Sequence, residues 1–197
     1  MTSGWEVAAV AAGGYLLGSL PSGYLVTRAA RGVDVRAVGS GNVGATNVVR
    51  AAGVGPGLLV FVLDAGKGAL SVWLARALLP EAPFAQVLAG LAAFAGHVAP
   101  FTLGFRGGKG VATALGVLAV LVPAAAACGL LAYAFVLLLT RVSSLSSLLA
   151  GPAALAAATR WPGTRLAVGL TSTLYLAMLW THRGNIRRLW RRVERRL

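Results

Sequence analysis

The sequence predicts an all-α integral membrane protein with about seven membrane-spanning helices, some of them short. Hydrophobic residues make up 57% of the 197 residues and charged residues only 12%, whereas a soluble domain is about 25% charged. The mean hydropathy is +0.77, and the apolar runs are long enough for helices rather than for barrel strands. This composition excludes a soluble domain, a disordered chain and a disulfide scaffold.

Each expected helix is a long apolar run with almost no charge. Residues 1–27 contain only Glu6, and residues 110–140 contain no charged residue. We expect spans near residues 5–27, 58–79, 84–103, 111–122, 124–140, 145–159 and 164–182. A full span needs about 20 residues, so the run 111–122 is short. One long helix over residues 111–140, kinked at Pro123, is the alternative.

Basic residues favour seven spans that form one transmembrane domain over residues 1–197. The N-terminus then lies outside and the C-terminus faces the cytoplasm. The segments placed inside hold 14 of the 18 lysines and arginines; they are residues 28–53, 104–110, 141–144 and 183–197. Positive charge collects on the cytoplasmic side of a membrane, and one helix over residues 111–140 would move the basic C-terminus outside. The sequence therefore predicts a multi-pass membrane protein whose basic loops face the cytoplasm.

Polar residues gather at the inside ends of these spans. The clusters are Gly39–Arg50, Asp64–Lys67, Gly96–Thr113, Ser143–Ser147 and His182–Asn185. Ionisable residues in or near a membrane are costly to bury and are functional candidates for that reason. Their convergence on one face of an apolar bundle predicts a site at the cytoplasmic interface.

The first cluster is a glycine-rich loop that ends in an arginine. Glycines let the backbone turn tightly, successive N–H groups form an anion-binding nest, and a guanidinium suits phosphate. We expect phosphate binding by Gly39, Ser40, Gly41, Asn42, Gly44, Ala45, Thr46, Asn47 and Arg50. The match to the dinucleotide pattern G-x-G-x-x-G is weak, because no strand–helix–strand unit surrounds it. A polar loop without a ligand is the alternative.

The second loop reads Gly-Phe-Arg-Gly-Gly-Lys-Gly over residues 104–110. It is not a nucleotide-binding P-loop, because a glycine stands where that motif needs Ser or Thr and no strand precedes it. A cation at a helix N-terminus needs an anionic partner. We therefore expect a second phosphate contact from Arg106, Gly107, Gly108, Lys109 and Gly110. A loop that serves only membrane topology is the alternative.

Five ionisable or amide side chains in or next to the spans complete the candidates. Asp64 and Lys67 lie one helical turn apart and are expected to form a buried ion pair that supports the bundle. His97 is expected to hydrogen-bond from helix to helix. His182 ends the last expected span and is either a general base or, together with Asn185, a substrate ligand.

Serines surround Leu145 at the start of the expected span 145–159. One serine of this cluster is expected to cap that helix, while Ser144, Ser146 and Ser147 are expected to line the site. No Ser-His-Asp set is present. Two histidines, one cysteine and five scattered acidic residues form no ligand cluster, so neither a metal nor a cofactor is expected.

Taken together and in this order, the motifs resemble the bacterial acyl-phosphate-dependent glycerol-3-phosphate acyltransferases, the PlsY family. The motifs that carry the resemblance are Gly39–Arg50, Asp64-x-x-Lys-Gly68, Gly96-His, Phe105–Thr113, Ser144–Ser147 and His182-Arg-x-Asn-Ile186. The family implies a seven-helix enzyme of the bacterial cytoplasmic membrane. It transfers a fatty acyl group from acyl phosphate to the sn-1 hydroxyl of glycerol 3-phosphate, giving lysophosphatidic acid and phosphate in the first step of phospholipid synthesis.

This chemistry agrees with the residues at hand. An acyl phosphate is already activated, so the enzyme needs mainly positioning and charge stabilisation. We expect direct attack by the substrate hydroxyl, with catalytic roles for His182, Lys109 and Ser40; the base is His182 or the phosphate of the acyl donor. Ala99 and Arg106 depart from the family, whose members usually carry Phe and Lys there.

The expected partners are acyl phosphate, glycerol 3-phosphate and membrane lipid, with no nucleic acid. A membrane transporter for small organic anions is the alternative function, since short helices and buried charges are also features of transporters. Such transporters often contain inverted repeats, and the sequence shows no internal repeat.

Overall fold

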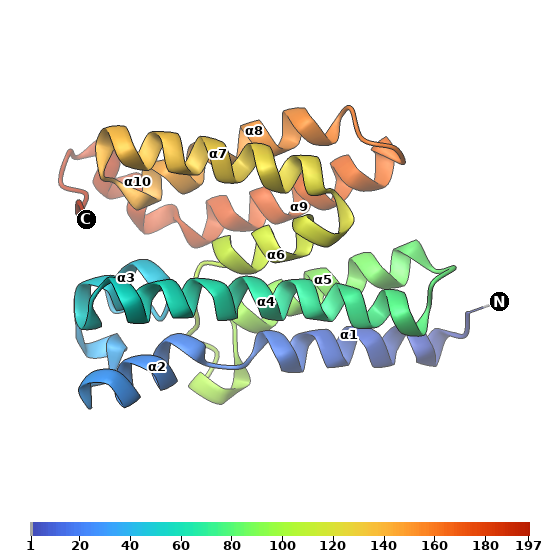
Figure 1. The fold of residues 1–197 in the computed structure, drawn as a ribbon, viewed down its shortest axis with the longest axis horizontal. Coiled ribbons are helices and arrows are strands. Elements are labelled where there is room, and N and C mark those ends of the chain that lie inside the picture. Colours follow the sequence, from blue (N-terminus) through green and yellow to red (C-terminus); the bar gives the residue numbers. More distant parts are fainter. Residues whose placement is uncertain (1) are drawn as a thin grey trace. The chain divides into compact units, whose positions relative to one another are not determined.

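The computed structural model describes residues 2–197, and every regular element in that range is a helix (Figure 1). The elements are α1 (Gly4–Gly18), α2 (Ser22–Arg31), η1 (Val35–Ala37), α3 (Ala45–Ala52), α4 (Val54–Leu78), α5 (Pro83–Val98), η2 (Phe101–Leu103), α6 (Val111–Leu121), α7 (Pro123–Thr140), α8 (Ser143–Ala158), α9 (Thr164–Thr181) and α10 (Arg183–Trp190). The prediction of an all-α protein is confirmed.

Within residues 2–197, four helical segments are long and apolar enough to cross a membrane. They are Gly4–Arg31, Val54–Leu78, Pro83–Leu103 and Pro123–Thr140. The helices Val111–Leu121 and Ser143–Ala158 are apolar but shorter. The number of crossings and the sides on which the loops lie stay predictions.

The chain forms two compact units, one that ends at Val117 and one that begins at Leu118. In the first unit α1 packs against α4 and α5, and α4 also contacts α2, α3 and α5. The α1–α5 contact is made by small residues. A Cβ atom at Gly14 or Gly18 would overlap the backbone carbonyl of Ala89 or Ala93. Small residues let membrane helices approach this closely.

The run expected as one span over residues 5–27 is interrupted in the structure. Pro21 has no N–H to donate and disfavours helical geometry at the residue before it, so α1 ends at Gly18 and α2 begins at Ser22. Thr102 Oγ1 donates to the Ser19 carbonyl at 2.7 Å, and Lys67 Nζ donates to the Leu20 carbonyl at 3.2 Å. Unsatisfied backbone groups are costly inside a membrane, so these two side chains stabilise the break.

The apolar run over residues 111–140 also forms two helices. Val122 leaves helical geometry with φ −143° and ψ 68°, and Pro123 occupies the first turn of α7. A proline is tolerated there because the first helical N–H groups have no intrahelical partner. The chain therefore forms α6 and α7 in place of one kinked helix.

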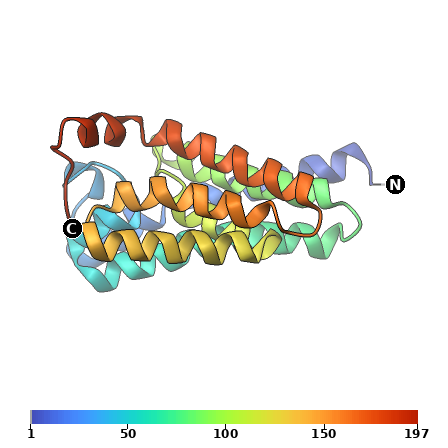
Figure 2. The same cartoon turned by 90° about the horizontal axis from the view of Figure 1, so that it is seen from above.

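The second unit contains α7, α8 and α9, with α8 in contact with both neighbours (Figure 2). The α8–α9 contact depends on Gly151, where a Cβ atom would overlap the ring of Tyr175. Helix α10 follows α9, and the C-terminal tail returns to the α7–α8 turn. There the Leu197 N–H donates to the Arg141 carbonyl at 2.8 Å.

The close α1–α5 contact predicts a stability difference between two glycines of the same helix. Gly18→Ala should lower the free energy of unfolding by roughly 1–3 kcal/mol, because its new methyl group overlaps backbone that has little room to move. Gly13→Ala is the matched control, since nothing lies within 4 Å of a Cβ atom there. It should be neutral or stabilising by up to about 1 kcal/mol. Thermal unfolding in detergent measures both, and equal melting temperatures would contradict this packing.

Candidate active site

The first glycine-rich loop is organised by Asn47. This side chain is buried, and its Oδ1 accepts a hydrogen bond from the Ser40 N–H at 2.8 Å. Its Nδ2 donates to the carbonyls of Val35 and Val38 at 3.0 and 2.9 Å. Gly39 and Gly41 adopt positive φ angles of 60° and 71°, which suit glycine. The hydrogen bonds of Asn47 therefore shape the loop.

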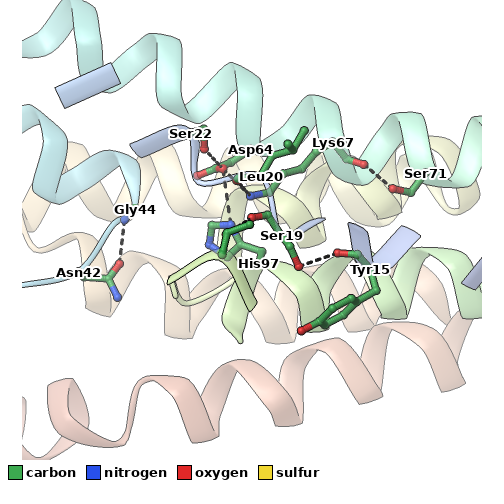
Figure 3. A network of polar contacts seen from close by, with 11 residues as sticks. Tyr15, Ser19, Leu20, Ser22, Asn42, Gly44, Asp64, Lys67, Ser71 and His97 are labelled. Atoms are coloured by element: carbon green, nitrogen blue, oxygen red, sulfur yellow. Dashed lines mark hydrogen bonds and ion pairs between the residues drawn. The ribbon is translucent and has the colours of Figure 1, made fainter. Parts of the chain in front are cut away.

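Asn42 links this loop to the second one. Its Oδ1 accepts from the Gly44 N–H at 2.9 Å, just before α3 begins at Ala45 (Figure 3). Its Nδ2 donates to the Gly107 carbonyl at 3.4 Å. The two glycine-rich loops thus lie next to one another in the first unit, as the sequence predicts for a shared site.

Thr46 and Arg50 lie on α3, which leaves the first loop. Arg50 is half-buried in the last turn of that helix. Its Cδ atom is 3.8 Å from the position that a Cβ atom on Gly39 would take. The arginine therefore runs alongside the start of the loop.

The chain that enters the first loop is ordered by an exposed ion pair. Asp34 accepts from the Arg36 N–H at 2.9 Å and from its Nη2 at 2.7 Å. The hydrogen bonds from the Arg36 side chain and backbone hold the pKa of the Asp34 carboxyl below its usual value. The Arg36 guanidinium also lies 5.3 Å from the centre of the Tyr24 ring on α2. Exposed pairs contribute little stability, so this one mainly sets the direction of the chain.

The second loop lies directly on the C-terminal end of α5. The Gly107 N–H donates to the Val98 carbonyl at 3.1 Å, and the Gly108 N–H donates to the His97 carbonyl at 3.0 Å. A Cβ atom at Gly108 would overlap the imidazole of His97. Both glycine N–H groups are thus committed to α5. These two N–H groups are therefore not available to a phosphate, which leaves Lys109 and the residues after it as the contacts this loop can offer on one side of the two glycines. Arg106 is exposed on the other side of them.

Helix α6 starts at Val111, two residues after Lys109. Its first N–H groups have no intrahelical partner and favour an anion. Gly110 has φ +84°, and a Cβ atom there would overlap the ring of Phe94. The hydroxyl of Thr113 in the first turn is fully buried and accepts no hydrogen bond from, nor donates one to, any residue of the described range 2–197. These features fit the anion site that the sequence predicts.

A buried charge network joins α2, α4 and α5 and reaches the second loop through His97 (Figure 3). Asp64 and Lys67 on α4 form the expected ion pair, with Nζ and Oδ1 2.9 Å apart. Ser22 Oγ donates to the same carboxylate oxygen, and His97 Nδ1 lies 3.5 Å from it. All four side chains belong to the first unit, and Asp64, Lys67 and His97 are at most 7% exposed. The sequence analysis did not predict Ser22 as a member of this network. Pro21, which interrupts the helix just before it, is the feature of the sequence that could have drawn attention to this position.

The serines of the second unit do not cap α8, which corrects the expectation from the sequence. The helix begins at Ser143 with Val142 as its N-cap residue. Ser146 Oγ donates to the Val142 carbonyl at 3.0 Å, and Ser147 Oγ donates to the Ser143 carbonyl at 2.9 Å. Short polar side chains often bond backward in this way within a helix.

Ser144 differs from its neighbours. Its side chain is 6% exposed, and its Oγ makes no hydrogen bond within the part of the chain that the structure describes. Buried hydroxyls normally have a partner. Because Ser144 stands in the first turn of α8, where N–H groups also lack intrahelical partners, it is suited to bind an anion.

His182 stands between α9 and α10 and is 2% exposed. Its Nδ1 lies 2.9 Å from the Met178 carbonyl. A carbonyl only accepts, so this contact requires a proton on Nδ1, and the lone pair of a neutral ring would then lie on Nε2. Asn185 Nδ2, one turn later, donates to Glu194 Oε1 at 2.7 Å. Glu194 was not expected from the sequence, because it lies beyond the motif in the C-terminal tail.

Helical membrane spans that carry glycine-rich basic loops and buried polar groups indicate a membrane protein that binds phosphorylated substrates. The family model for glycerol-3-phosphate acyltransferases matches residues 8–192. The chain therefore belongs to the glycerol-3-phosphate acyltransferase family, and the resemblance found in its motifs is confirmed.

Individual relatives agree with this membership. The glycerol-3-phosphate acyltransferase of Myxococcus xanthus (strain DK1622) is 57% identical over 183 residues, which cover 93% of this chain and 95% of the relative. That of Anaeromyxobacter dehalogenans (strain 2CP-C) is 48% identical and covers 96% of each chain.

Two solved structures have the same fold. Both are crystal structures of PlsY (YgiH), an integral membrane glycerol 3-phosphate acyltransferase. The glycerol 3-phosphate form has a TM-score of 0.89 at 37% identity, and the lysophosphatidic acid form has 0.87 at 36%. Each alignment covers 97% of this chain and 95% of the other.

Proposed function

We propose that this protein transfers a fatty acyl group from acyl phosphate to the sn-1 hydroxyl of glycerol 3-phosphate in the bacterial cell membrane. The products are lysophosphatidic acid and phosphate. The observation that carries the proposal is the similarity to PlsY in its glycerol 3-phosphate form, which has the same fold over 97% of this chain at 37% sequence identity.

The reaction needs no covalent enzyme intermediate. The substrate hydroxyl oxygen attacks the acyl carbonyl carbon, the bond from that carbon to the phosphate oxygen breaks, and inorganic phosphate leaves. The hydroxyl proton passes to a phosphate oxygen of the acyl donor. The protein then contributes orientation of two phosphorylated substrates and stabilisation of negative charge.

Cationic and backbone groups of the first unit are proposed to bind phosphate. Arg50 offers a planar guanidinium beside the first loop. Lys109 offers an ammonium immediately before the N-terminus of α6, where an anion is favoured. Ser40, whose N–H is held by Asn47, is proposed to stabilise the reacting carbonyl or phosphate with its hydroxyl.

The second unit is proposed to bind glycerol 3-phosphate through Ser144, His182 and Asn185. Ser144 has a buried hydroxyl with an unused hydrogen-bonding capacity among the described residues. The lone pair on His182 Nε2 accepts a hydrogen bond from a substrate hydroxyl and so orients it. We assign His182 this binding role because the acyl donor brings its own phosphate oxygens to take the proton.

The acyl donor is the first test of this proposal. Purified protein in lipid should form lysophosphatidic acid from glycerol 3-phosphate and acyl phosphate, and should do so poorly or not at all with acyl-CoA. The reason is that the proposed loops, with Arg50 and Lys109, recognise the small phosphate group that leaves from acyl phosphate. Equal turnover with acyl-CoA, or no turnover with acyl phosphate, would refute the proposed donor.

The role of His182 predicts a particular kinetic pattern. If it only holds the acceptor, His182→Asn should raise the KM for glycerol 3-phosphate while kcat at saturation changes little, the pattern of lost uniform binding. Circular dichroism and elution as a single species serve as folding controls. A fall in kcat of about 10²-fold or more at unchanged KM would instead identify His182 as the general base.

A further inference from the structure

The His97 imidazole is the point at which the buried charge network touches the second glycine loop. On one side, Nδ1 lies 3.5 Å from Asp64 Oδ1. On the other side, the ring lies against Gly108 so closely that a Cβ atom there would overlap Nε2 and its neighbours. The backbone of the same residue accepts the Gly108 N–H at 3.0 Å. His97 therefore contacts the loop through both its ring and its carbonyl.

Asp64 fixes the orientation of that ring. The carboxylate is 1% exposed and is held by Lys67 Nζ at 2.9 Å and by Ser22 Oγ. Lys67 also donates to the Leu20 carbonyl at 3.2 Å. The α1–α2 break and α4 thus hold the carboxylate from two directions, and His97 on α5 faces a group that cannot easily shift.

The same support reaches the first glycine loop. Gly23 follows Ser22, and a Cβ atom on it would overlap the Val43 carbonyl. Asn42 in turn donates to the Gly107 carbonyl at 3.4 Å. Both loops therefore pack against one layer, which is made by the start of α2 and the end of α5.

We propose that His97, oriented by Asp64, is a positioning residue that sets the place of Gly107–Lys109 and thereby of the Lys109 ammonium and the α6 N-terminus toward a substrate phosphate. This inference rests on the phosphate role proposed above for Lys109. His97 is 6% exposed and Gly108 packs against its ring, so the proposed role requires no direct contact with substrate. Gly108 is glycine because any side chain would lift the loop off the imidazole.

The contact predicts that two opposite changes in size compensate one another. Gly108→Ala pushes the loop away from the ring, and His97→Ala removes the ring beneath it. KM is measured for glycerol 3-phosphate and for acyl phosphate. For the substrate whose KM rises in Lys109→Ala, each single variant should also raise KM by about tenfold, with a smaller effect on kcat. The double variant, in which the new methyl group enters the space left by the ring, should recover most of that loss.

Tyr15→Phe is the matched control. It removes one hydrogen bond from the same end of α5, the 2.8 Å bond from the Tyr15 hydroxyl to the Ala99 carbonyl, without touching the loop. Its KM should stay within about twofold of the parent value. His97→Asn keeps an N–H near the position of Nδ1 and should lie between His97→Ala and the parent, which provides a second reading if His97→Ala does not fold.

The outcomes separate this inference from the proposed function. A normal KM in Lys109→Ala would remove the phosphate role of the loop and this inference with it. If Lys109→Ala raises KM but the His97 and Gly108 variants leave it unchanged, or if their losses multiply in the double variant, the positioning role of His97 alone is overturned. A Tyr15→Phe variant as impaired as His97→Ala would also overturn it.

Discussion

A carboxylate placed in the apolar interior of a membrane bundle is the constraint on which the first unit depends. An isolated buried charge is so costly that it must be paired and hydrogen-bonded. Asp64 meets this requirement with Lys67, Ser22 and His97, from three helices. Once those partners are required, the positions of α2 and α5 relative to α4 follow.

The interruptions of the helices are coupled to the same network. A break in a membrane helix leaves carbonyls that water cannot reach, and here side chains of other elements supply the donors. Lys67 donates to the Leu20 carbonyl at the α1–α2 break in addition to pairing with Asp64, and Thr102 donates to the Ser19 carbonyl at the same break. The resulting layer is rigid where the glycine-rich loops lie on it, which is what the binding of small phosphorylated substrates requires.

Local patterns in the sequence were sufficient for the fold class, the family and the Asp64–Lys67 pair, because hydropathy, the individual motifs and the i,i+3 spacing can each be recognised within a short stretch of sequence. The partners of that pair were not predictable, since Ser22 lies 42 residues before Asp64 and no pattern links them. The commitment of the Gly107 and Gly108 N–H groups to α5 was not predictable either, because no sequence pattern marks a loop that folds back onto the preceding helix. The predicted serine cap of α8 was wrong because the helix already begins at Ser143, with Val142 as its N-cap residue, so that the serines lie inside the helix.

The dependence on the buried pair is tested most directly by the unfolding free energies of Asp64→Asn, Lys67→Met and the double variant in detergent micelles. Each single change leaves one buried charge without its main partner and should cost about 3–5 kcal/mol. The double change removes both charges, and the account predicts that it recovers most of that loss. Losses that simply add in the double variant would show that the two charges are independent and would contradict the account.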